Sequence, residues 1–136
     1  MANVVLPKVR MFIPCVGVDL DPKRPVVIYS PLHTIRMAPG IKEKYLLDEM
    51  WFYVVLTDAV GAFRLSVELF GTEDVVLRKS KPENVTFVGG TQLNAKELRL
   101  PMKSVPFPHA GLYEFRLLAN HAPVDGGVAL LRMLPG

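Results

Sequence analysis

The fold is indicated most clearly by the segment Ala110-Gly111-Leu112-Tyr113-Glu114-Phe115-Arg116-Leu117-Leu118-Ala119. Along this segment, the apolar residues Tyr113, Phe115 and Leu117 alternate with the charged residues Glu114 and Arg116. Successive side chains of an extended strand point to opposite faces of a sheet, so this alternation is typical of a half-buried antiparallel strand. The segment therefore predicts a strand that turns one of its faces to a core.

The order of Gly111, Tyr113 and Phe115 also fits a tyrosine corner. In this motif, a tyrosine near the start of a late strand hydrogen-bonds back to nearby backbone, and the residue two places further on enters the core of a sandwich. Phe115 stands where antibody-type domains carry their second cysteine. The segment therefore predicts an immunoglobulin-like sandwich without the disulfide.

The rest of the chain repeats this kind of pattern. Phe63, Leu65, Val67 and Leu69 alternate with polar residues, and Gly, Pro, Asn and Asp separate about eight such segments. The helices that would alternate with strands in a parallel sheet are missing from the pattern. We expect an all-β, Ig-like antiparallel β-sandwich formed by residues 1–136 as a single domain, with a short helix and a loop as the two alternatives for residues 41–49.

One expected strand, Trp51–Leu56, is apolar on both of its faces. It is either a central strand packed on both sides or a strand partly covered by a partner. Trp51, Phe52 and Tyr53 are consecutive, so at least one of these rings faces away from the other two. An outward ring would suit a homodimer interface or a carbohydrate platform, and burial under a covering loop is the favoured alternative.

Composition limits the possible partners and the compartment. The chain has 136 residues, half of them apolar, and a net charge of +3, which is too small to indicate nucleic acid or an anionic membrane. Cys15 is the only cysteine, so neither an intramolecular disulfide nor a paired-cysteine zinc site is expected. The apolar run Met11–Val18 is short and contains Pro14, which argues against a signal peptide. A reducing, cytoplasmic setting is therefore expected.

Residues able to carry chemistry are few and scattered. His109 and His121 bracket the Tyr113 strand, so they should lie roughly 25 Å or more apart, too far to share a metal ion. A loop-built enzyme site would use Cys15 or His33, but apolar residues surround Cys15 and no acid accompanies His33. A calcium site would need several aspartates to converge, and the candidates are spread over four loops: Asp19, Asp21, Asp58, Asp74 and Asp125. No catalytic, cofactor-binding or metal-binding residue is assigned, and no cofactor is expected.

From Trp51 onward, the chain runs through an apolar strand, an Asp-x-x-Gly hairpin, an alternating strand and a glycine-rich break, and ends with Pro108, Gly111, Tyr113 and Phe115 in that order. In this it resembles a family of small uncharacterised bacterial proteins with an Ig-like β-sandwich fold. Residues 51–134 carry the resemblance, and residues 1–50 match more loosely. The resemblance implies the fold and offers no catalytic residues to transfer.

These observations favour a non-catalytic cytoplasmic protein that acts through protein contacts. Self-association as a homodimer is expected first, with an unidentified protein partner as the alternative occupant. Two other functions remain open: a ligand-binding module for carbohydrate or Ca²⁺, and an enzyme whose site is assembled from loops.

Overall fold

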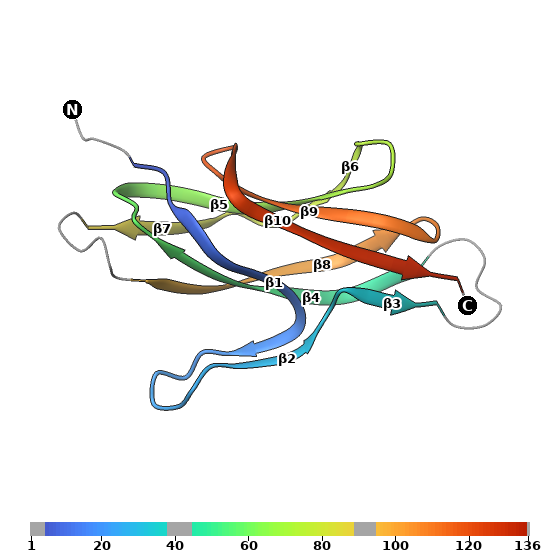
Figure 1. The fold of residues 1–136 in the computed structure, drawn as a ribbon, viewed down its shortest axis with the longest axis horizontal. Helices are drawn as coiled ribbons and strands as arrows, with labels where there is room; N and C mark the ends of the chain where they lie inside the picture. The colour runs from blue at the N-terminus through green and yellow to red at the C-terminus, as the bar shows by residue number, and fades with distance from the viewer. Residues whose placement is uncertain (1–4, 38–44, 89–94, 136) are drawn as a thin grey trace.

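The computed structural model describes residues 5–37, 45–88 and 95–135 of the chain. Its ten strands form two sheets that pack face to face as a β-sandwich (Figure 1). The strands are β1 (Lys8–Asp19), β2 (Val27–Pro31), β3 (Thr34–Arg36), β4 (Tyr45–Thr57), β5 (Gly61–Phe70), β6 (Val76–Lys79), β7 (Glu83–Phe87), β8 (Lys96–Phe107), β9 (Gly111–Ala119) and β10 (Ala122–Leu134). In these residues, no helix has the length and apolar character needed to cross a membrane.

The strands are divided unequally between the sheets. One sheet has four strands in the order β2-β1-β4-β8, and the other has six in the order β3-β10-β9-β5-β6, with β7 also paired to β5. The named strand pairs are antiparallel except β3 and β10, which run parallel. The all-β sandwich predicted from the sequence is therefore confirmed, with one parallel pair at the rim of the larger sheet.

Two local expectations need correction. The described residues form ten strands where about eight were expected, and the three-residue strand β3, in the segment after β2, is one of the additional strands. Of the range 41–49, residues 45–49 belong to β4, and residues 41–44 lie outside the described residues. Tyr45 and Leu47 pair with Phe107 and Val105 of β8 and pack against the core. This pairing satisfies the backbone groups of β4 and overrides the weak helical pattern of the segment.

Aromatic rings join the two sheets at the centre of the core. Phe52 of β4 meets Phe115 of β9 edge to face, with 4.9 Å between the ring centroids. Phe107 of β8 meets Tyr113 of β9 in the same way at 5.0 Å. These rings are almost completely buried, and edge-to-face pairs add to the stabilisation that burial of their area provides. The alternation that predicted β9 therefore does deliver Tyr113, Phe115 and Leu117 to the core.

The tyrosine corner is also confirmed. The hydroxyl of Tyr113 donates a hydrogen bond to the carbonyl oxygen of His109 at 2.6 Å and accepts one from the His109 N–H at 3.2 Å. Only 1 % of Tyr113 is exposed, so these bonds satisfy a buried hydroxyl and the backbone of the β8–β9 connection together. The corner thereby fixes where β9 begins.

One of the two edges of the four-stranded sheet resists further pairing. It is formed by β8, in which Pro101 and Pro106 have no N–H to donate and Ser104 has a φ of 53°. Arg78 of the opposite sheet donates from its Nε to the carbonyl oxygen of Lys103 at 3.0 Å. Prolines, an irregular residue and a covered carbonyl are the devices by which edge strands avoid recruiting another strand.

We expect Tyr113→Phe to destabilise the fold by about 1–3 kcal/mol, because it removes the part-buried hydrogen bonds that join Tyr113 to the His109 backbone. Urea unfolding followed by the fluorescence of Trp51, the single tryptophan, measures the change. Tyr29→Phe is the matched control, since Tyr29 is 53 % exposed and should lose nothing. Equal stabilities of the two variants would show that the corner does not hold the fold.

Candidate functional site

The strand that is apolar on both faces is packed on both sides. Phe52, Val54 and Leu56 face the space between the sheets and are fully buried. Tyr53 faces the other side and is 6 % exposed, as part of a second, smaller apolar cluster with Trp51 on the outer face of the four-stranded sheet. The rings therefore divide as the sequence requires, with Phe52 facing inward and its two neighbours outward.

The cover over this second cluster comes from the chain itself. Strand β1 pairs with β4 as far as Cys15, and from Cys15 to Asp19 it pairs with β2. We name residues 16–31 the β1–β2 arm; in Figure 1 the arm bends away from the sandwich below β4. Four apolar side chains of the arm pack on the cluster: Val18, Leu20, Val26 and Ile28. The arm thus buries Tyr53 and covers part of Trp51, which matches the covering-loop alternative.

Arg99 of β8 ties the arm to the sheet. Its Nη1 donates to the carbonyl oxygen of Val18 at 3.0 Å, and its guanidinium carbon lies 5.3 Å from the centroid of the Trp51 ring. A cation at this distance from an indole is attracted to the ring. One side chain therefore links β8, β4 and the arm.

Cys15 lies beneath the arm and is unsuited to nucleophilic catalysis. Its side chain is fully buried, and its Sγ lies 3.5 Å from the carbonyl oxygen of Trp51, to which it donates. Burial raises the pKa of the Cys15 thiol, which keeps it protonated at neutral pH, whereas the thiolate is the reactive form. His33 lies on the surface with its Nδ1 beside Thr34. The arrangement offers Cys15 no activating histidine among the described residues.

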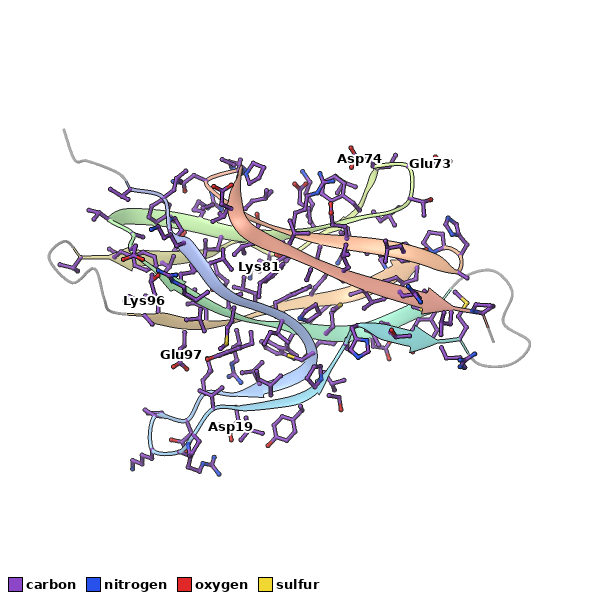
Figure 2. The ribbon with its side chains drawn as sticks, viewed as in Figure 1. Asp19, Glu73, Asp74, Lys81, Lys96 and Glu97 are labelled. Carbon is purple, nitrogen blue, oxygen red and sulfur yellow. The ribbon has the colours of Figure 1, made fainter. Side chains whose placement is uncertain are left out.

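The five candidate calcium ligands are dispersed: four of them are paired with arginines, and the fifth, Asp125, lies in β10. Asp19 and Asp21 bind Arg24, Asp58 binds Arg10, and Asp74 binds Arg116. Figure 2 shows Asp19 in the arm and Asp74 on the β5–β6 loop at opposite sides of the molecule. Within residues 5–37, 45–88 and 95–135, no three histidine, cysteine or acidic side chains come together as metal ligands would. His109 and His121 lie before and after β9, at its opposite ends.

The outer face of the six-stranded sheet exposes a group of aliphatic side chains beside charged ones. We name as the β9–β10 face the six outward side chains of these two strands, Leu112, Glu114, Arg116, Val128, Leu130 and Arg132. They alternate with buried residues of β9 and β10, so the pleat of the sheet exposes them. Leu112, Val128 and Leu130 are 50 %, 51 % and 53 % exposed. Three half-exposed aliphatic side chains therefore lie among charged ones on one face.

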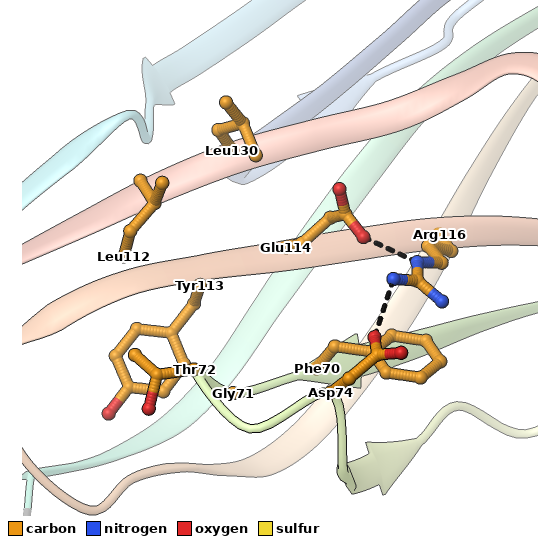
Figure 3. Close-up of a pocket in the computed structure, with 9 residues that line it drawn as sticks. All are labelled: Phe70, Gly71, Thr72, Asp74, Leu112, Tyr113, Glu114, Arg116 and Leu130. Carbon is orange, nitrogen blue, oxygen red and sulfur yellow. Dashed lines mark hydrogen bonds and ion pairs between the residues drawn. The ribbon is translucent and has the colours of Figure 1, made fainter.

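A depression of about 330 Å³ opens on this face beside the β5–β6 loop (Figure 3). Leu112 and Leu130 form part of its apolar wall, and Asp74, Glu114 and Arg116 supply its charges. The loop is a tight turn in which the N–H of Asp74 donates to the carbonyl oxygen of Gly71, and Asp74 has a φ of 57°. Aspartate tolerates this left-handed conformation better than most residues, which explains its use here.

Arg116 organises the charges of the depression. Its Nε donates to Glu114, its Nη2 donates to Asp74 at 2.8 Å, and its guanidinium carbon lies 3.7 Å from the centroid of the Phe70 ring. The hydrogen bonds to Glu114 and Asp74 raise the pKa of Arg116, so the guanidinium stays charged at physiological pH. Two carboxylates share this one cation, which leaves the depression with an excess of negative charge.

Sequence reasoning marked Glu114 and Arg116 only as the polar side of a strand and did not find this site. Its ion pair joins Arg116 to Asp74, which is 42 residues away in the chain. The available signal was that Leu112, at an outward position of the same strand, is aliphatic. A single outward aliphatic residue is ordinary, and it indicates a contact surface only when neighbouring strands place further aliphatic side chains beside it.

We expect native Cys15 to react slowly with iodoacetamide at pH 8, and Arg99→Ala to speed the reaction because it releases the arm from β8. Intact-mass spectrometry over time measures the modification of this single thiol. Lys103→Ala, which removes another basic side chain of β8, is the control and should leave the rate unchanged. Rapid modification of the unaltered protein would mean that the arm does not protect Cys15.

The chain was compared with models of known protein families and with curated proteins, and neither comparison finds a match. Family membership therefore assigns no activity to the site. The chemistry of the β9–β10 face and of its depression supplies the basis for a function.

Proposed function

We propose that the protein is a non-catalytic β-sandwich that acts through protein contacts, and that it self-associates through the β9–β10 face. The observation that carries this proposal is the set of three half-exposed aliphatic side chains on that face, Leu112, Val128 and Leu130. The solvent face of an antiparallel sheet is ordinarily polar, and adjacent exposed apolar residues on a folded protein commonly mark a contact surface.

The sheet register supports a continuous apolar strip. Leu112 lies directly opposite Arg132, and Leu130 lies directly opposite Glu114 on the neighbouring strand. Leu112 and Leu130 are therefore diagonal neighbours, about 7–8 Å apart and within reach of each other's side chains. Val128 lies two residues before Leu130 and on the same side of β10, so the apolar strip extends over both strands.

The edges of the sandwich are less suited to association than this face. Prolines and a covered carbonyl obstruct β8. The other edge strand of that sheet, β2, has five residues and ends at Ser30, with a φ of 47°, and Pro31. In the larger sheet, β3 has three residues, and the side of β5 away from β9 is occupied by the short strands β6 and β7. Short or interrupted edge strands offer few backbone groups to a second chain. Contact between faces therefore agrees better with the fold than the addition of a strand does.

The alternatives have weaker support. A carbohydrate platform on the Trp51–Tyr53 segment would need its rings exposed, but the arm buries Tyr53 and part of Trp51, and the exposed ring of Tyr29 lies on the arm itself. Calcium would have to displace the arginines that bind Asp19, Asp58 and Asp74. An enzyme built on Cys15 would need a thiolate that burial disfavours.

We also propose an immunoglobulin-like connectivity and a reducing, cytoplasmic compartment in a bacterial cell. The tyrosine corner of β9 supports the first proposal, since this corner is a recurring feature of such sandwiches. The single buried thiol of Cys15 supports the second, because a protein with one sequestered cysteine draws no stability from oxidation.

We expect the protein to form dimers at micromolar concentration and Leu130→Asp to weaken dimerisation roughly ten- to a hundredfold, since a buried leucine contributes about 1.5–3 kcal/mol. Size-exclusion chromatography with light scattering, repeated over a dilution series, measures the mass. Leu46→Asp is the matched control, because Leu46 is 50 % exposed on a strand of the other sheet.

A single monomeric mass for the unaltered protein across the series would reject self-association. Equal weakening by Leu46→Asp and Leu130→Asp would reject the β9–β10 face as its location.

A further inference from the structure

The β9–β10 face carries both the acidic depression and an exposed arginine, Arg132. We propose that the depression beside the β5–β6 loop receives Arg132 of a second copy of this chain, in a dimer with two-fold symmetry. This inference rests on the proposed function and adds the partner, the symmetry and the residues that meet.

The chemistry of the depression suits an arginine. Asp74 and Glu114 both bind Arg116, the one basic residue in the described lining of the depression, so this lining carries one more negative charge than positive. Leu112 and Leu130 give it apolar walls. An arginine has an aliphatic stem that packs along apolar surface and a planar head that binds carboxylates with several hydrogen bonds. Asp74 is the more accessible acceptor, since 76 % of its side chain is exposed.

Arg132 is the arginine placed to supply this contact. It lies on the exposed side of β10, directly opposite Leu112, and makes no ion pair with any residue that the structure describes. The neighbouring strand β3 aligns Thr34 with Arg132 and Arg36 with Leu134, so the rim of the sheet next to Arg132 is basic. The β5–β6 side of the face carries the acids Glu73 and Asp74, which Figure 2 shows together on the loop.

This placement of charges is complementary to itself. The basic rim and the acidic depression lie on either side of Leu112 and Leu130. Rotation of a second copy about an axis through these leucines brings each Arg132 to the depression of the other copy. The leucines then meet at the centre, and both charge contacts form at once, as the isologous contact of a two-fold dimer requires. Complementary charges of this kind fix the register and exclude wrong partners.

Reversed charges test the arrangement. Arg132→Glu and Asp74→Lys should each weaken the homodimer roughly tenfold or more, because each variant places like charges together at both contacts. An equimolar mixture of the two should restore dimerisation as a heterodimer. In that heterodimer, one contact pairs Glu with Lys and the other pairs the unaltered Arg132 with the unaltered Asp74.

Sedimentation equilibrium gives the dissociation constants, and native mass spectrometry with one isotope-labelled variant identifies the heterodimer. Arg64→Glu is the matched control: Arg64 is exposed on β5 of the same sheet and pairs with Asn84, away from the depression, so the homodimer should be unchanged. Thermal melting of each variant verifies folding. If Asp74→Lys fails to fold, Asp74→Asn and Arg132→Gln replace the reversed charges and should each weaken the dimer.

The outcomes separate this inference from the function on which it rests. Weakened homodimers and a restored heterodimer support the two-fold contact. A dimer that Leu130→Asp dissociates but Arg132→Glu leaves intact would overturn the arginine contact and keep self-association through the face. A monomeric unaltered protein would overturn both.

Discussion

The structure depends on the contact of aromatic rings across the two sheets. Phe52 and Phe115 join β4 to β9 at the centre, and the neighbouring ring of Tyr113 is held by the backbone of His109. Because the corner fixes the start of β9, it also fixes which residues of that strand face outward. Glu114 and Arg116 reach the outer surface in a set register for this reason. A buried hydroxyl and two buried rings thus determine the geometry of the exposed site.

Much of the fold could be predicted because it is encoded by local alternation. The period-two pattern of β5 and β9 identified the core residues of both strands, and the apolar run after Trp51 indicated packing on two sides. The full length of β8 could not be predicted, because Pro101 and Pro106 suggest a break and only an edge position tolerates them. The arm was also missed: no local pattern shows that β1 leaves one partner at Cys15 and takes another.

The site was less predictable because it is built by long-range pairing. Phe70 is a large apolar residue of the kind usually found in a core, yet its side chain lies on the outer face of the sheet and is covered by the guanidinium of Arg116. Asp74 reaches Arg116 only because a tight turn returns β6 beside β5. Each residue is ordinary for its position, and the excess negative charge arises only when β5, the loop and β9 are assembled. Analysis of single segments therefore predicts the strands that carry these residues, but it does not predict that the residues meet.

The obstructed edge of β8 has a consequence for the protein in concentrated solution. Amyloid-like growth needs an unbroken strand whose backbone can template the next chain, and this edge lacks amide hydrogens at two positions and bends at Ser104. Copies that collide along β8 therefore cannot start a fibril there. Because β8 is the longest edge strand of the sandwich, the protection lies where the exposed backbone would otherwise be most extensive.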